Sequence, residues 1–235
     1  MVKWVFLDIG DVLFDEDVPH QWLFHSILLT LRAHGKNVLW DDWNRTRREL
    51  TARGPNPEAA IKESLAVYCA SVSETEIVWD MARAAYNKMR AVRPYGFLLD
   101  GITPVLEDLR ADFRLGIVAN QHPPVAEAVA EYGLTPLFDV IVISETVNLF
   151  KPDPAIFEYA LAEAGITAPE ALFIGDRADN DIRPAKALGM KTVRLRRGNQ
   201  YALYNPAGAE FQADATVESV ADLAAAVRRV SESQE

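Results

Sequence analysis

The stretch WVFLDIGDVL at residues 4–13 begins with four apolar residues and then becomes polar. A short apolar run of this kind predicts a buried strand over residues 4–7, with Asp8 carrying a carboxylate into the following loop. Runs of the same kind recur at residues 115–118, 140–143, 172–174 and 192–195. The sequence therefore predicts five buried strands.

Helical segments separate these strands. A helix is predicted over residues 103–112, where Thr-Pro stands at the start, and another over 153–165, between Asp-Pro and a glycine. A third is expected from about residue 181 to 189. Strands alternating with helices predict an α/β fold with a doubly wound, parallel, Rossmann-like sheet. In such sheets, ligands bind at the carboxyl ends of the strands.

Residues 15–99 break the alternation, because they contain no convincing strand. Helices are expected at about 20–34, 57–70 and 77–92, the last preceded by a capping box at 73–76, and the sequence RGPNP at 53–57 predicts a break between helices. We therefore predict two domains. An α/β core comprises residues 1–14 and 100–235, and an inserted α-helical cap comprises residues 15–99.

Aromatic and basic residues stand out in the insert. Trp22, Trp40, Trp43 and Trp79 are expected to form a helical core rather than a substrate cage. Arg45, Arg47 and Arg48 are expected on a solvated helix face balanced by nearby acidic residues.

The bulk composition excludes several classes of protein. The 235 residues carry a formal net charge of −10, which disfavours nucleic-acid binding. The single cysteine, Cys69, rules out an intramolecular disulfide and a cysteine-based zinc site, and is expected to be a small core residue. Neither a secretory signal nor an apolar stretch long enough for a membrane span is apparent, so we expect a soluble, cytoplasmic protein.

Four segments lie at the predicted strand ends. They are DIGDVL at 8–13, GIVANQ at 116–121, KPDP at 151–154 and the Gly175-Asp176 pair followed by Asp181. Their order, with a helical insert after the first, resembles the haloacid dehalogenase-like hydrolase superfamily over nearly the whole chain. The resemblance implies an aspartate nucleophile, which can take up a phosphoryl group and be released by water.

The resemblance also implies roles for individual residues. Asp8 would be the nucleophile and Lys151 its cationic partner, neutralising the clustered anions. A Mg²⁺ ion would be held by Asp8, the main-chain carbonyl of Gly10 and Asp176, with Asp181 nearby. Three residues are candidates for substrate binding: Asn120, Gln121 and Arg177. Arg177 could instead pair with Asp179.

Two positions depart from the family pattern. Related phosphatases carry a second aspartate, a general acid and base, where this chain has Gly10, and Asp11 one residue later is not assigned that role. Ala119 stands where the family has serine or threonine. General acid–base help is worth about 10²–10⁴ in rate, so a slow enzyme is expected.

Several functions remain open on the sequence alone. The first is a Mg²⁺-dependent phosphatase of a small phosphorylated metabolite. Alternatives are a metal-independent 2-haloacid dehalogenase, whose halide leaving group needs no proton, a phosphonatase-like enzyme using a lysine of the insert (Lys36, Lys62 or Lys88), and a non-catalytic binding protein of the same fold. Retention of both Asp176 and Asp181 favours phosphoryl transfer. The substrate and the oligomeric state are left open.

Overall fold

The computed structural model describes residues 1–53, 57–92, 96–198 and 201–233, and the chain divides into two compact units. The first unit contains Met1–Asp15, Phe97–Arg197 and Ala207–Glu235. The second contains Glu16–Gly96 and Gly198–Pro206. Gly198–Pro206 therefore groups with the helical insert, whereas the sequence placed it in the α/β core.

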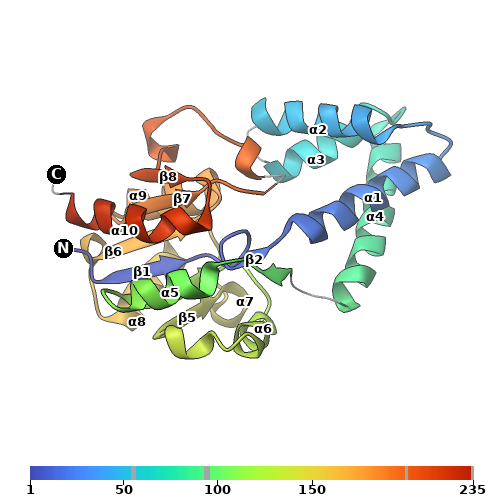
Figure 1. Ribbon diagram of the computed structural model, residues 1–235. Helices are drawn as coiled ribbons and strands as arrows, with labels where there is room; N and C mark the ends of the chain where they lie inside the picture. The colour runs from blue at the N-terminus through green and yellow to red at the C-terminus, as the bar shows by residue number, and fades with distance from the viewer. Residues whose placement is uncertain (54–56, 93–95, 199–200, 234–235) are drawn as a thin grey trace. The chain divides into compact units, whose positions relative to one another are not determined.

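The first unit is built on a six-stranded sheet in which all neighbouring strands run parallel, in the order β5-β4-β1-β6-β7-β8 (Figure 1). The strands are β1 (Trp4–Leu7), β4 (Arg114–Ala119), β5 (Val140–Ile143), β6 (Ala171–Gly175), β7 (Lys191–Leu195) and β8 (Ala215–Val217). The first five of these contain the predicted apolar runs. The predicted parallel α/β sheet is confirmed, while β8 has only three residues and gave no periodic signal.

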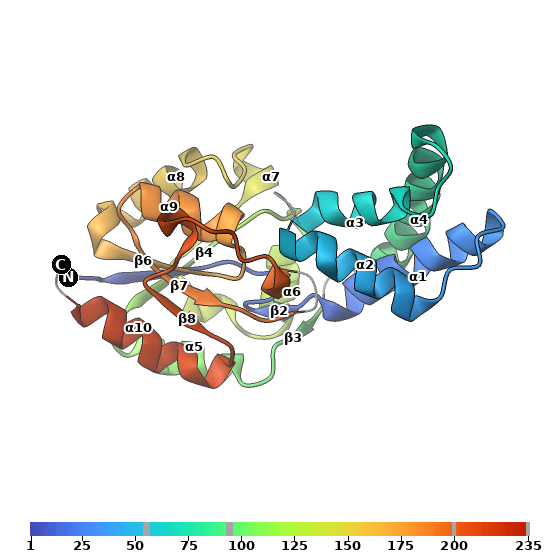
Figure 2. The ribbon, with the colours of Figure 1, turned by 90° about the horizontal axis from the view of Figure 1, so that it is seen from above.

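Helices cover both faces of this sheet. Figure 2 shows α8 (Ala155–Ala164) and α9 (Arg183–Ala187) on one face, and α5 (Ile102–Arg110) and α10 (Leu223–Glu232) on the other. The remaining short helices and turns are α6 (Val125–Glu131), α7 (Ser144–Val147), η1 (Thr135–Leu137), η2 (Ala168–Glu170), η3 (Ala178–Ile182), η5 (Ala209–Phe211) and η6 (Val220–Asp222). Because helices cover both faces of such a sheet, its ligands bind at the carboxyl ends of the strands.

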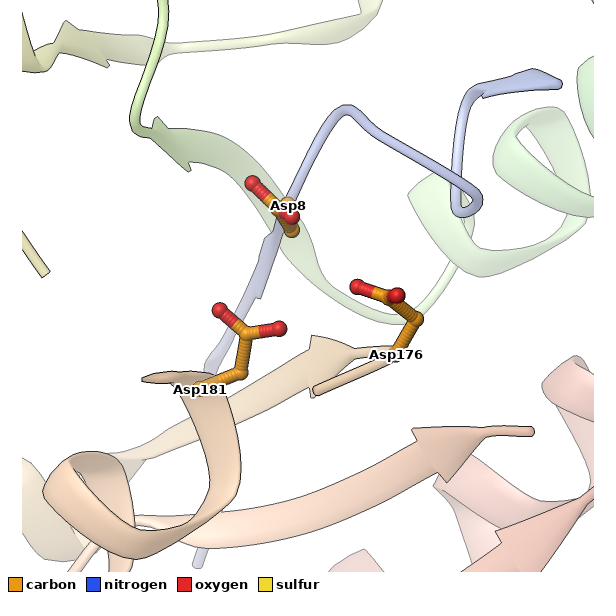
Figure 3. Close-up of side chains that lie close together, drawn as sticks. All are labelled: Asp8, Asp176 and Asp181. Carbon is orange, nitrogen blue, oxygen red and sulfur yellow. The ribbon is translucent and has the colours of Figure 1, made fainter. Parts of the chain in front are cut away.

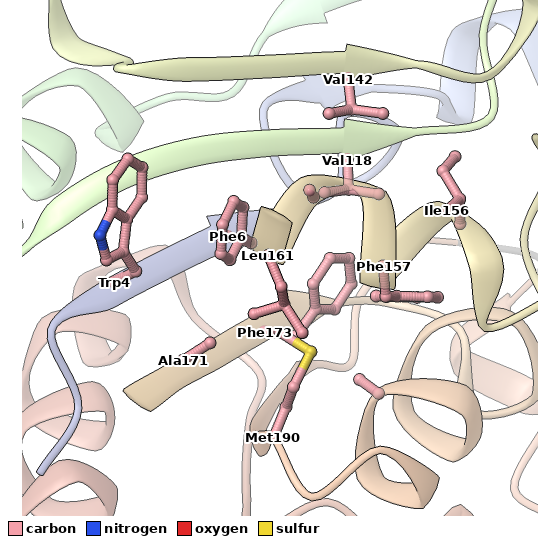
Figure 4. Packing of buried hydrophobic residues seen from close by; sticks show 12 residues of the cluster. Trp4, Phe6, Val118, Val142, Ile156, Phe157, Leu161, Ala171, Phe173 and Met190 are labelled. Carbon is pink, nitrogen blue, oxygen red and sulfur yellow. The ribbon is translucent and has the colours of Figure 1, made fainter. Parts of the chain in front are cut away.

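The core beneath α8 fixes the central strands. Alternate residues of β1 point to this face, where the rings of Trp4 and Phe6 stack with centroids 5.5 Å apart. Phe173 of β6 meets Phe157 of α8 edge to face at 5.0 Å (Figure 4). All four side chains are buried. This packing holds β1 and β6 in register, so the residues that follow them leave the sheet side by side.

A two-stranded antiparallel sheet completes the first unit. It pairs β2 (Phe14–Asp15) with β3 (Phe97–Leu98). Both strands were assigned to the insert or its border, because two residues are too few to show an alternation.

The second unit consists of the helices α1 (Asp17–Ala33), α2 (Trp40–Arg53), α3 (Pro57–Ala66) and α4 (Val72–Val92), with the short turn η4 (Tyr201–Leu203). Its core contains Trp43, which is fully buried and lies 5.2 Å from the ring of Phe24. Trp40 and Trp79 are partly buried and pack against the same cluster, as does Cys69. The expectation of a helical tryptophan core is confirmed for Trp40, Trp43 and Trp79, whereas Trp22 is half-buried and stays a prediction.

Two expectations for this unit were wrong. Arg47 does not lie on a solvated face: it is buried, with its guanidinium 4.4 Å above the ring of Phe24. Helix α4 begins at Val72 and is capped by Ser71, two residues before the predicted capping residue Ser73, because the Ser71 hydroxyl accepts the Glu74 N–H at 3.1 Å. The predicted break at 53–57 falls largely on residues 54–56, which lie outside the described residues. No helix in the described ranges is long and apolar enough to cross a membrane.

Candidate active site

Two adjacent strands, β1 and β6, and the turn η3 bring the candidate carboxylates together at the carboxyl edge of the sheet. Asp8 follows β1, and Asp176 follows β6, the neighbour of β1. Asp181 lies in η3 and turns back toward them, so the three carboxylates face a common space (Figure 3). One oxygen from each lies within 4.8 Å of the others. The strand order reverses around β1, which is where open α/β sheets bind ligands.

Lys151 supplies a positive charge to this cluster. Its Nζ lies 2.7 Å from Asp8 Oδ1 and 2.6 Å from Asp181 Oδ1, and the lysine side chain is only 1% exposed. Burial lowers the pKa of the Lys151 ammonium, but the charges of Asp181 and Asp8 outweigh burial and raise it above its usual value. Lys151 therefore stays charged at neutral pH.

Asp181 is held at both of its carboxylate oxygens. Oδ1 accepts from Lys151, and Oδ2 accepts from the main-chain N–H of Arg177 at 3.0 Å. Its side chain lies directly against Gly175, where an added Cβ would be 2.4 Å from the Cβ of Asp181. Only a glycine at position 175 allows η3 to approach β6 this closely.

Asp176 is buried at 2% exposure, and its Oδ2 accepts no hydrogen bond from the described part of the chain. Burial raises the pKa of the Asp176 carboxyl well above its usual value, and the negative charges of Asp181, Asp11 and Asp8 raise it further. The main-chain carbonyl of Asp176 accepts from Nε of the buried Arg194 at 2.8 Å. The sequence analysis missed Arg194, although a charged residue within the apolar run of β7 was an available signal.

The donor set suits a divalent cation. With all three carboxylates ionised, this cluster and the Lys151 ammonium would carry a formal charge of −2, and Asp176 Oδ2 has no hydrogen-bond partner among the described residues. Burial also raises the pKa of Asp8, and Asp181 adds to that effect, although Lys151 opposes it. Oxygen ligands with excess negative charge are those that Mg²⁺ binds in proteins.

Asp8 differs from the other two carboxylates in accessibility. Its side chain is 13% exposed, whereas that of Asp181 is fully buried. It is thus the carboxylate that an incoming molecule can reach.

The three predicted substrate-binding residues have other contacts within the chain. The Asn120 carboxamide bonds to the main chain of Lys151. The main chain of Gln121 bonds to the Ser144 hydroxyl, which the sequence analysis did not single out. The guanidinium of Arg177 pairs with Asp179 at 2.9 Å, as the sequence allowed. A role in substrate binding stays a prediction for all three.

The loop after Asp8 turns back sharply on itself. The main-chain N–H of Asp11 donates to Phe14 O at 2.7 Å, and Asp11 adopts a left-handed φ of 51°. Its side chain is buried and pairs with Arg197 at 3.1 Å. Arg197 also pairs with Asp15 at 2.9 Å, and so ties the segment after β7 to the two-stranded sheet of β2 and β3. Asp11 thus has a structural partner in Arg197.

Comparison with known proteins points to one family. A model of the haloacid dehalogenase-like hydrolases matches residues 2–189. The chain is 26% identical to a glyceraldehyde 3-phosphate phosphatase of Methanocaldococcus jannaschii, over 98% of this chain and 99% of that protein. It is 28% identical to a phosphoserine phosphatase of Thermus thermophilus, over 80% and 73% of the two chains.

A solved structure shares the fold. A 2-haloacid dehalogenase from Pseudomonas syringae superposes with a TM-score of 0.58 at 22% identity, over 97% of this chain and 99% of that one. The family match, the parallel sheet and the carboxylate–lysine cluster at its edge agree. The chain belongs to the haloacid dehalogenase-like hydrolases.

Proposed function

We propose that this hydrolase is a Mg²⁺-dependent phosphatase that cleaves a small phosphorylated metabolite through an aspartyl-phosphate on Asp8. The proposal rests mainly on the accessible Asp8 carboxylate, which pairs with the buried Lys151 and has an oxygen within 4.8 Å of an oxygen of Asp176. The similarity to a glyceraldehyde 3-phosphate phosphatase and to a phosphoserine phosphatase supports a small phosphorylated molecule as the substrate.

The metal would be held by Asp8, Asp176 and the main-chain carbonyl of Gly10. When bound, Mg²⁺ supplies positive charge that offsets the repulsion between a phosphate and the carboxylates. Both oxygens of Asp181 already accept hydrogen bonds, which favours a role for Asp181 in orienting Lys151.

The chain's own residues then perform two displacements. An oxygen of Asp8 forms a bond to phosphorus while the bond from phosphorus to the ester oxygen breaks, and the departing alkoxide takes its proton from water. Lys151 stays protonated and stabilises the charge on the transferring group. Water next attacks phosphorus, releasing inorganic phosphate, a proton and the Asp8 carboxylate. Because Gly10 offers no side-chain acid, we propose that the enzyme prefers esters whose leaving group needs little protonation.

A panel of phosphate esters, assayed with Mg²⁺ and with EDTA, tests the proposal. Turnover should require Mg²⁺ and should vanish in Asp8→Asn. Asp80→Asn, a change at an exposed site on α4, is the matched control and should retain full activity. Turnover that survives Asp8→Asn would refute the mechanism. Metal-free turnover of 2-haloacids alone would replace it with the dehalogenase alternative.

A further inference from the structure

The side chain of Asn120 forms two hydrogen bonds to the main chain of one residue. Its Oδ1 accepts from Lys151 N–H, and its Nδ2 donates to Lys151 C=O, both at 2.8 Å. Asn120 follows β4 and Lys151 lies in the turn after α7, 31 positions later. The contact therefore joins two loops at the same edge of the sheet.

A carboxamide suits this contact because it presents one acceptor and one donor in a plane, as a peptide group does. The two partners also fix its orientation, since reversing the amide would set donor against donor and acceptor against acceptor. Lys151 belongs to no helix or strand that would supply these bonds. Asn120 therefore bonds the main-chain N–H and C=O of Lys151 as a neighbouring strand would in a sheet.

The anchoring matters because the far end of the same residue must be placed accurately. Lys151 Nζ lies between Asp8 and Asp181 at 2.7 and 2.6 Å, at the end of a flexible four-carbon side chain. A displacement of the main chain would be carried into both contacts. The Asn120 loop is itself held at the next residue, where Ser144 Oγ accepts from Gln121 N–H at 3.0 Å.

We infer that Asn120 is a positioning residue that sets Lys151 between Asp8 and Asp181, rather than a residue that binds substrate. The inference rests on the proposed function for the role of Lys151 in phosphoryl transfer. The contact itself does not depend on that role.

The experiment compares Asn120→Ala and Asn120→Asp with the wild-type protein and with Asn87→Ala, a matched change on the exposed surface of α4. Misplacement of a reacting group by about 1 Å costs about 10²-fold, so we expect kcat on the best phosphate ester to fall about 10²-fold. KM should change less than about threefold, because the lost bonds are not made to substrate. Asn120→Asp keeps an oxygen that can accept from the Lys151 N–H. It replaces Asn120→Ala in the comparison if Asn120→Ala does not fold.

The Lys151→Met background provides a test that a merely structural role would not pass. There, Asn120→Ala should lower the remaining kcat by less than about threefold, because residues that act as one unit are not additive. An equal fall in both backgrounds would overturn the inference. So would a raised KM with unchanged kcat, which would indicate substrate binding.

Amide exchange of Lys151, followed by NMR, separates this inference from the proposed function. Loss of the bond to Asn120 should speed exchange of the Lys151 N–H by about tenfold or more in Asn120→Ala, and not in Asn87→Ala. If the wild-type protein hydrolyses no phosphate ester, the proposed function fails. The exchange measurement alone then tests whether Asn120 positions Lys151. Unchanged exchange would overturn the inference in either case.

Discussion

Replacing Lys151 by methionine should expose how far the folded state depends on one buried cation. Methionine nearly keeps the volume and flexibility of the lysine stem, which passes the Phe173 ring with Nζ 5.5 Å from its centroid. The substitution therefore removes the charge with little change in packing. Asp8 and Asp181 then lose the ammonium that they share.

The size of the effect follows from the two contacts. At 2.6 and 2.7 Å, each contributes a gross attraction of about 6 kcal/mol at an effective dielectric constant of about 20. Much of this offsets the cost of removing the ions from water. Deleting one partner of a buried pair typically lowers the free energy of unfolding by about 3–5 kcal/mol, and we expect that range in metal-free buffer at pH 8.

The free energy of unfolding lost in Lys151→Met should become smaller as the pH falls. Burial already raises the pKa of Asp8 and of Asp176 in the folded protein, and removing Lys151 takes away a charge that lowers the pKa of Asp8. Above the usual carboxyl value of 3.8, the folded state therefore binds more protons than the unfolded state. Stability falls as the pH rises through this window, and more steeply in the variant.

Urea unfolding in EDTA at pH 5 and pH 8 measures the loss in free energy of unfolding and its dependence on pH. Lys3→Met is the control in the same unit, since Lys3 forms only an exposed pair with Glu170, and its effect should be far smaller. A loss of less than about 1 kcal/mol at pH 8, equal at pH 5, would refute the view that Lys151 compensates the carboxylates.

Three further changes test separate parts of the molecule. Gly175→Ala should lower the free energy of unfolding by about 1–3 kcal/mol in urea, because its Cβ would lie 2.4 Å from that of Asp181; unchanged stability would contradict the close approach. Asp176→Asn should raise the metal-free Tm at pH 8, because it removes a buried charge. It should also abolish the rise in Tm on adding Mg²⁺, because it removes a proposed ligand, and a retained Mg²⁺ response would count against Asp176 as that ligand. Phe24→Ala should destabilise the second unit by about 3–5 kcal/mol, followed by tryptophan fluorescence, because the ring packs on Trp43 and beneath Arg47; a loss under about 1 kcal/mol would mean that the helices repack.

The parallel sheet was predictable because its strands are buried on both faces and appear as apolar runs. β1 and β5 match their predicted bounds, and β4, β6 and β7 are extended by one or two residues. The two-stranded sheet of β2 and β3 was not predictable, since its strands form through contact between segments about 80 residues apart. The burial of Arg47 was missed because its neighbours in sequence are charged, while the aromatic rings that cover it come partly from another helix.

For the site, the sequence supplied the residue types and their strand ends, and the structure supplied their partners. Asp8, Lys151, Asp176 and Asp181 lie together as the motif order implied. Neither the double hydrogen bond of Asn120 nor the contact from Arg194 to Asp176 could be inferred. Each joins a side chain to a main-chain group of a residue that is distant in sequence. Because almost every residue carries the same main-chain N–H and C=O groups, residue types do not reveal which of them a side chain will contact.

The segment Gly198–Pro206 has a consequence for protein engineering. The chain passes between the two units at 15/16, 96/97, 197/198 and 206/207, so the helical unit is not one continuous piece. Splicing residue 15 directly to residue 97 would leave Tyr201 without His20, whose ring it meets edge to face at 5.4 Å. A chimera that exchanges the helical unit for that of another hydrolase should therefore carry both segments together, as a paired graft.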